Sequence, residues 1–227
     1  MKKVYIGVGH GGADPGAVKF IVEKEYTFKT AIELKSILEG RGIETLLSRT
    51  GDYETDLNDK VRHCNSFSPD LVIDIHYNAG GGSGFEIYYS RAGGTGKTLA
   101  ENINAEMSKI MKSRGIKTKL GNGGTDYFAI IRDTTAPAVL AEGGFVDTES
   151  DANFIRDNYK LIAKAYADGI CKTLGVSTET KKPEVAATGT LYRVQCGAFS
   201  VKANAEKRLE EVKKAGFADA YIVEANK

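Results

Sequence analysis

The chain has 227 residues, enough to bury one α/β core and to carry a small extra module, so we expect one main domain with an accessory rather than two domains of equal size. With 31 basic and 30 acidic side chains the net charge is +1, so no global field would hold nucleic acid or an anionic membrane. The three cysteines lack the short paired spacings of thiolate metal sites and disulfide frameworks. We therefore expect a partner that is recognised by a local site, and neither nucleic acid nor a membrane in that role.

Segments with alternating apolar residues and segments with helical periodicity follow one another along most of the chain. This order predicts an α/β fold with a twisted, mostly parallel sheet of six strands, flanked by helices on both faces. The expected strands are Lys3–Gly9, Glu44–Ser48, Leu71–His76, Gly84–Tyr89, Tyr127–Arg132 and Ala138–Glu142. The expected helices are Tyr26–Glu39, Asp56–Asn65, Lys97–Ser113 and Ser150–Leu174, the last broken near Asn158.

The composition changes after Leu174. Residues 175–190 are polar and have no apolar periodicity, which is typical of a flexible linker. A strand at Tyr192–Ala198, a helix at Lys202–Ala215 and a strand at Ala220–Glu224 are then expected. We predict a main domain in residues 1–174 and a small β-α-β module in residues 191–227.

Four polar residues lie at the ends of predicted elements. His10 and His76 end the first and third strands, Glu142 ends the last strand, and Glu23 lies just before the first helix. Ligands of an open parallel sheet bind beyond the carboxyl ends of its strands, so this fold would bring the four side chains together. Two imidazoles and a carboxylate are one of the sets that bind catalytic zinc and leave a fourth position open, and Glu142 would remain as a base. Taken singly, none of these residues is convincing: a histidine at a strand end or a glutamate near a helix start is commonly an ordinary polar residue, and this explanation is weaker only for Glu142, where a strand leaves the core.

Several short motifs occur in a fixed order between Lys3 and about Asp151. They are His10-Gly11-Gly12 with Asp14-Pro15-Gly16-Ala17, Glu23-Lys24-Glu25-Tyr26-Thr27-Phe28, Leu47-Ser48-Arg49-Thr50, Ile75-His76-Tyr77-Asn78-Ala79-Gly80-Gly81, Ile131-Arg132 with Pro137-Ala138-Val139-Leu140, and Glu142 with Gly144-Phe145-Val146-Asp147. In these motifs the chain resembles the zinc-dependent N-acetylmuramoyl-L-alanine amidases of the Amidase_3 class, found in cell-wall autolysins and phage endolysins, and above all the sporulation mother-cell amidases.

The resemblance implies a function and a set of roles. His10, Glu23 and His76 would hold Zn²⁺, and Glu142 would be the catalytic carboxylate. The substrate would be the peptidoglycan bond between N-acetylmuramic acid and the L-alanine of the stem peptide. Asn78 and Arg132 match motif positions that could contact substrate, although a strand cap and a surface salt bridge explain them equally well.

Two residues near these motifs leave alternatives open. Glu25 competes with Glu23 as a ligand, and helix periodicity favours Glu23 because that choice brings the following apolar residues into register with the family's helix. Asp74 stands where the family more often has serine, and it is either solvated at the sheet edge or orients a ligand. A zinc peptidase that cuts another peptidoglycan bond and a glycan-binding protein without activity also remain possible.

Residues 93–98 form a glycine-rich motif after a strand and before a helix, as a phosphate-binding loop does. Arg91 stands where the first glycine of that pattern belongs, so we interpret the segment as a glycine turn that enters a helix.

The tail from Leu191 resembles the first half of a SPOR repeat, a module that binds peptidoglycan glycan strands. Since half a module buries little surface, we expect two chains to pair their tails in a homodimer. The apolar run after Met1 is too short for a secretory signal, so we expect synthesis in the cytoplasm without a signal peptide. Action on the wall would then follow release by a holin or by lysis of the mother cell.

Overall fold

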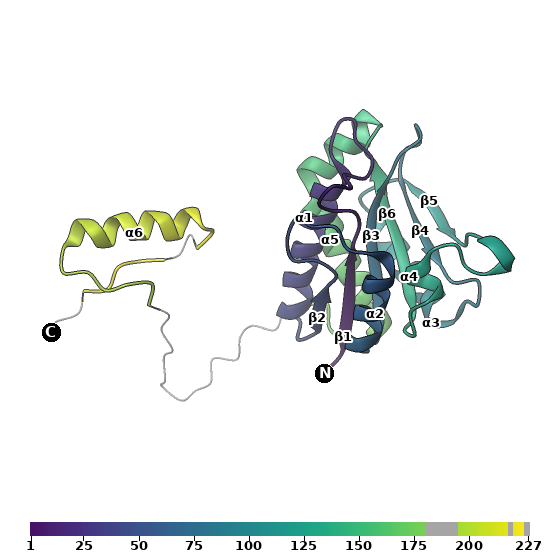
Figure 1. The fold of residues 1–227 in the computed structure, drawn as a ribbon, viewed down its shortest axis with the longest axis horizontal. Coiled ribbons are helices and arrows are strands. Elements are labelled where there is room, and N and C mark those ends of the chain that lie inside the picture. Colours follow the sequence, from purple (N-terminus) through teal and green to yellow (C-terminus); the bar gives the residue numbers. More distant parts are fainter. Residues whose placement is uncertain (180–194, 218–219, 225–227) are drawn as a thin grey trace. The chain divides into compact units, whose positions relative to one another are not determined.

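A computed structural model describes residues 1–179, 195–217 and 220–224, and the chain divides into two units, Met1–Lys182 and Pro183–Lys227. The first unit contains one sheet in the order β2-β1-β3-β6-β4-β5 (Figure 1). Its strands are β1 Lys3–Val8, β2 Glu44–Leu47, β3 Leu71–Asn78, β4 Phe85–Tyr89, β5 Ser113–Lys117 and β6 Ala138–Phe145. Neighbouring strands are parallel except β4 and β6, which are antiparallel. The predicted fold class is confirmed.

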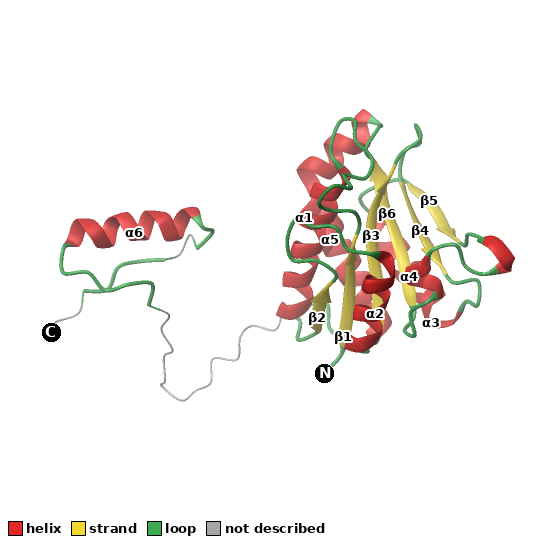
Figure 2. Ribbon diagram, viewed as in Figure 1, coloured by secondary structure: helices red, strands yellow, loops and turns green. Residues whose placement is uncertain are grey.

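Helices cover both faces of this sheet (Figure 2). They are α1 Glu23–Gly40, α2 Leu57–Phe67, α3 Gly94–Met107, α4 Ala129–Arg132 and α5 Glu149–Leu174, with a short 3₁₀ helix at Asn122–Gly124. The backbone of α5 leaves helical geometry at Asn158, where the sequence predicts a break. None of the described helices has the length and apolar character needed to cross a membrane.

Alternate residues of the central strands pack into two separate cores. Val4 and Ile6 of β1 face the larger core with α1, α3 and α5, whereas Tyr5 faces the smaller core with α2 and α4. Because parallel strands are buried on both faces, their sequences read as nearly continuous apolar runs. The same alternation places Asp74, His76 and Glu142 on the face that carries α2 and α4.

The predicted fifth strand, Tyr127–Arg132, is wrong. Residues Ala129–Arg132 form α4, and two consecutive side chains, Ile130 and Ile131, are buried in the smaller core. A short apolar run of this kind does not distinguish a buried helical turn from a strand. The fifth strand is β5, Ser113–Lys117, which is partly exposed at the sheet edge and has no apolar alternation to mark it. The predicted helix up to Ser113 accordingly ends earlier, at Met107.

The second unit contains α6, Lys202–Lys214, close to the helix predicted there. Residues 195–198 and 220–224 are not in strands, contrary to the prediction, and residues 192–194 lie outside the described residues. A strand needs a hydrogen-bonded neighbour, and no such neighbour occurs among the described residues of this unit. Most of the predicted linker, from residue 180 onward, is also outside the described part.

Candidate active site

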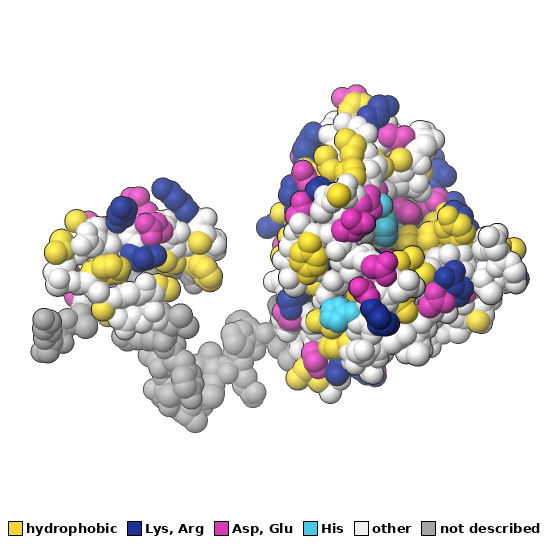
Figure 3. Space-filling model, viewed as in Figure 1, with side chains coloured by type: hydrophobic (Ala, Val, Ile, Leu, Met, Phe, Trp, Pro, Cys, Tyr) yellow, Lys and Arg dark blue, Asp and Glu magenta, His cyan; other side chains and the backbone are white. Residues whose placement is uncertain are grey.

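Two of the predicted site residues lie inside strands rather than at their ends. β3 continues two residues beyond His76, and β6 continues three residues beyond Glu142. These two residues are direct partners in the parallel pairing of β3 and β6, so their side chains lie side by side on one face. Both are partly exposed, and in the space-filling view histidine and acidic side chains lie beside a hollow in this face (Figure 3).

Glu23 is the first residue of α1, which begins three residues earlier than predicted. It is 3% exposed, whereas Glu25 in the same turn is exposed. Both oxygens of Glu23 are fixed by the backbone: Oε1 accepts from the Tyr77 N–H at 3.0 Å and Oε2 from the Ala17 N–H at 2.9 Å. Of the two carboxylates that compete in the sequence, the structure brings Glu23 to the histidines.

His10, Glu23 and His76 converge into one cluster. Glu23 Oε1 lies 3.0 Å from His10 Nε2 and 3.1 Å from His76 Nδ1, and one donor atom of each residue lies within 4.8 Å of the other two. The two rings meet edge to face, with centroids 5.0 Å apart. Two imidazole nitrogens and one carboxylate oxygen at this spacing fit a divalent ion that keeps a further position open. The cluster could therefore hold a metal.

The backbone around His10 is adapted to this arrangement. His10 has φ +58°, a left-handed conformation that costs a residue with a Cβ free energy. Its Nδ1 lies 2.7 Å from Asp14 Oδ2, so a carboxylate supports the side of the ring that faces away from Glu23. Gly16 closes this loop with φ +65°, and a Cβ there would lie 2.6 Å from both Glu23 Oε2 and His10 Cδ2. Glycine at this position allows the loop to pack directly against Glu23 and His10, which a side chain would prevent.

The surroundings of the cluster favour a positive charge. Burial alone would raise the pKa of Glu23, but hydrogen bonds from His10 and His76 outweigh it and lower the pKa to about 2. Burial alone would lower the pKa of His76, but the nearby carboxylate of Asp74 and the hydrogen bond with Glu23 raise the pKa to about 10. Burial would also lower the pKa of His10, but the neighbouring carboxylates of Glu23 and Asp14 raise it. A cation is thus stabilised at this place by fixed carboxylates.

Glu142 lies next to the cluster and differs from the other carboxylates. Its Oε2 atom is buried and has no hydrogen-bond partner among the residues that the structure describes. Burial raises the pKa of Glu142 to about 7, and the negative charges of Glu23, Glu86 and Asp74 add to this against the opposing effect of His76. A carboxylate with a pKa near neutrality can both accept and donate a proton there.

Glu86 is a further acidic residue of this face, and the sequence analysis missed it. It is the direct partner of Glu142 in the antiparallel pairing of β4 and β6 and is 3% exposed. Its Oε2 accepts from Arg114 Nε at 2.7 Å and from Lys117 Nζ at 2.5 Å. The signal in the sequence is a lone charge inside the apolar strand Phe85–Tyr89, on the face shared with Glu142.

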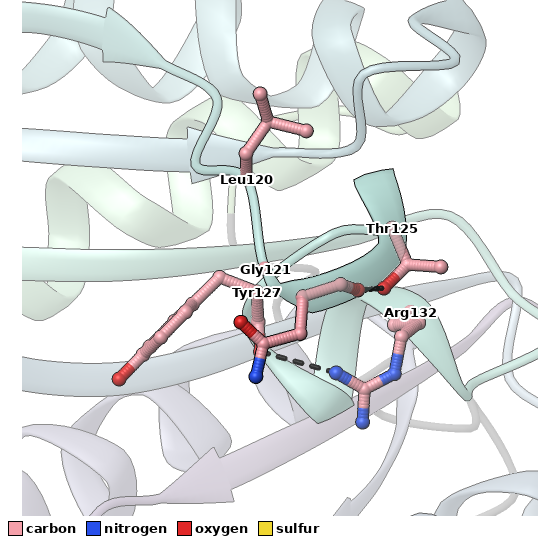
Figure 4. Close-up of a pocket in the computed structure, with 6 residues that line it drawn as sticks. Leu120, Gly121, Thr125, Tyr127 and Arg132 are labelled. Atoms are coloured by element: carbon pink, nitrogen blue, oxygen red, sulfur yellow. Dashed lines mark hydrogen bonds between the residues drawn. The ribbon is translucent and has the colours of Figure 1, made fainter.

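The two predicted substrate contacts are engaged with other protein groups. Asn78 Nδ2 donates to Glu86 Oε1 at 3.1 Å. Arg132, at the end of α4, donates from Nη2 to Asp133 Oδ2 at 2.8 Å. Arg132 also lines a pocket of about 410 Å³ together with Leu120, Gly121, Asn122, Thr125 and Tyr127 (Figure 4). Contact with substrate stays a prediction for both residues.

Two imidazoles and a buried carboxylate, beside a carboxylate with no hydrogen-bond partner in the described part of the chain, are the arrangement of a metal-dependent hydrolase. The family model described as N-acetylmuramoyl-L-alanine amidase matches residues 4–172, and the SPOR domain model matches residues 175–227. The chain belongs to the N-acetylmuramoyl-L-alanine amidase family.

Individual relatives agree with this membership. The chain is 36% identical over 225 residues to the sporulation-specific N-acetylmuramoyl-L-alanine amidase of Bacillus subtilis (strain 168), covering 96% of this chain and 83% of that protein. It is 33% identical over 187 residues to the endolysin of Bacillus phage SPP1, covering 79% of this chain and 68% of that protein. A solved structure also matches: the catalytic domain of CwlV, an N-acetylmuramoyl-L-alanine amidase from Bacillus (Paenibacillus) polymyxa var. colistinus. The TM-score is 0.70 at 31% identity, and the match covers 78% of this chain and 100% of that domain.

Proposed function

We propose that this chain hydrolyses the amide bond between N-acetylmuramic acid and the first L-alanine of the peptidoglycan stem peptide, at Zn²⁺ held by His10, Glu23 and His76. The observation that carries the proposal is the convergence of these three side chains beside the unpaired carboxylate of Glu142. Membership of the amidase family supports the choice of bond.

The chemistry divides between the metal and the protein. Bound zinc supplies a positive charge that polarises the amide carbonyl and acidifies a water molecule. His10, Glu23 and His76 are tied to the backbone or to other carboxylates, so they would hold the ion without reorganising. Each donor is thus fixed before the substrate arrives.

Glu142 is the proposed proton carrier. It takes a proton from the attacking water as the water oxygen bonds to the carbonyl carbon. It then gives this proton to the alanine nitrogen as the carbon–nitrogen bond breaks. The products are a free carboxyl on the lactyl group of muramic acid and a free amino terminus on the stem peptide. A group with a pKa of about 7 matches both halves of this transfer near neutral pH.

The second unit extends the proposal to the glycan strand. Its match to the SPOR domain supports peptidoglycan as the partner of both units. Pairing of two tails in a homodimer stays a prediction, which sedimentation of the full chain against a chain ending at Gly175 would test. Delivery to the wall by lysis of the producing cell also stays a prediction.

Digestion of purified peptidoglycan tests the proposed activity. The full chain should release free L-alanine amino termini and leave whole glycan strands, as identified by mass spectrometry. A chelator should stop the reaction and added zinc should restore it. New termini at another peptide bond would instead indicate a zinc peptidase, and binding without cleavage would indicate a glycan-binding protein.

A further inference from the structure

Lys60 and Asp74 form a buried ion pair beside the metal cluster. Asp74 lies in β3 two residues before His76, so both side chains leave the strand on the same face. Lys60 belongs to α2, which packs on that face, and its Nζ lies 2.5 Å from Asp74 Oδ1. The two side chains are 7% and 4% exposed, so the pair is almost completely removed from water.

The second oxygen of Asp74 faces the imidazole of His76. Asp74 Oδ2 lies 3.6 Å from His76 Nε2, while the other ring nitrogen, Nδ1, lies 3.1 Å from Glu23 Oε1 inside the cluster. The ring is therefore held between a carboxylate on one side and the cluster on the other. In a neutral imidazole whose N–H points at a carboxylate, the other nitrogen carries the lone pair that binds a metal.

The neighbouring strand leaves space for this pair. Gly7 of β1 is the register partner of Asp74 in β3. A Cβ at Gly7 would lie 2.2 Å from Asp74 Oδ1 and 2.9 Å from Lys60 Cε. Any other residue at this position would displace the pair, so β1, β3 and α2 together define one position for the carboxylate.

Stability alone does not account for an ion pair at this place. Its surroundings are the smaller core, in which Tyr5, Cys64 and Val72 are buried. The removal of two charges from water is costly, and apolar residues of similar volume often replace such a pair without loss of stability. The pair is better explained by what it does to the one functional group that it faces, His76.

We propose that Lys60 and Asp74 are positioning residues for His76. Lys60 fixes the carboxylate of Asp74, and Asp74 Oδ2 faces Nε2 of His76 at 3.6 Å, so that Nδ1 points into the cluster. Asp14 supports the far nitrogen of His10 in the same way but from the surface. This inference rests on the metal site of the proposed function, and neither residue touches the reacting atoms.

Zinc affinity of the full chain, measured by competition with a chromophoric chelator, tests the proposal alongside the melting temperature of the zinc-free protein. Asp74→Asn should weaken zinc binding by about 10- to 100-fold. Lys60→Met should lower the melting temperature, because it leaves Asp74 buried without a partner. The double variant Lys60→Met/Asp74→Asn should recover the melting temperature and keep the weakened zinc binding.

Asp168 provides the matched control, because it forms another buried ion pair, with Arg41 at 2.6 Å, between α5 and the end of α1. Asp168→Asn should lower the melting temperature and leave zinc affinity unchanged. The proposal is overturned if the double variant binds zinc as tightly as the wild type, or if affinity simply follows melting temperature in every variant. If the double variant does not fold, the zinc affinities of Asp74→Asn and Asp168→Asn decide: the proposal requires weaker binding in Asp74→Asn alone.

The same measurements separate this inference from the proposed function. A wild-type chain that binds no zinc removes the metal site and the positioning pair together. A wild-type chain that binds zinc but leaves peptidoglycan intact removes only the proposed activity.

Discussion

Glu86 and Glu142 face each other directly across the antiparallel pairing of β4 and β6. Burial alone would raise the pKa of Glu86, but hydrogen bonds from Lys117 and Arg114 lower it to about 2, so this carboxylate stays charged. Its charge is one of those that raise the pKa of Glu142. One acidic residue, kept ionised by its own cations, thereby helps to set the protonation of its neighbour.

Glu142→Gln should remove most of the activity while it preserves the metal site. We expect kcat to fall by about 10²- to 10⁴-fold, because the amide cannot carry the proton. Zinc affinity should stay at the wild-type value, since Glu142 is not a ligand in this account. Turnover of a soluble muropeptide and a chelator competition check the two expectations, and a variant with unchanged turnover would exclude Glu142 as the base.

The pH dependence of stability offers a second test of Glu142. Its folded-state pKa, about 7, lies above the ordinary glutamate pKa of 4.5, so the folded state binds more protons between these values. Stability therefore falls as the pH rises from about 4.5 to 7. Between pH 5 and pH 8, the melting temperature of the zinc-free Glu142→Gln variant should therefore rise relative to that of the zinc-free wild type. A constant difference over this range would contradict the raised pKa.

Glu86→Gln should have the opposite pH dependence. The depressed pKa of Glu86 stabilises the folded state at pH values above the ordinary glutamate pKa of 4.5, and this stabilisation is lost as the pH falls towards about 2. We expect a loss of about 1 kcal/mol at pH 7, because Arg114 and Lys117 are more than a third exposed and water screens them. Thermal unfolding from pH 7 to pH 3 should show the two proteins converging. A gap that widens on acidification would contradict this.

Gly16→Ala should damage the site through a backbone position. A Cβ at Gly16 would overlap Glu23 and His10, and we expect activity to fall by at least about 10-fold as these donors move. Gly175→Ala is the control, since Gly175 has nearly the same φ, +66°, and nothing within 4 Å of the added carbon. Both variants should lose about 1 kcal/mol of stability from the left-handed conformation, but only Gly16→Ala should bind zinc more weakly.

Much of the fold follows from the sequence because buried parallel strands and amphipathic helices have distinct periods. The edge strand β5 could not be predicted in this way, because its side chains are partly exposed and show no apolar alternation. The segment around Ile130 and Ile131 misleads for the converse reason: consecutive apolar residues fit a buried turn of helix as well as a strand.

The convergence of His10, Glu23 and His76 was predictable because each of them stands at or near the end of a recognisable element. Their supporting groups were not. The environment of Asp74 depends on Lys60, which approaches from α2 and shares no local pattern with β3. Glu86 meets Glu142 only because β4 runs antiparallel to β6, an orientation that the strand pattern alone does not give.

Anomalous diffraction at the zinc edge from crystals of the zinc-loaded chain tests the central claim most directly. The account predicts one strong peak with His10, Glu23 and His76 as the protein ligands, non-protein oxygen in the remaining positions, and Glu142 beside them without coordinating. A peak elsewhere, or an ion whose coordination is completed by protein atoms alone, would contradict it.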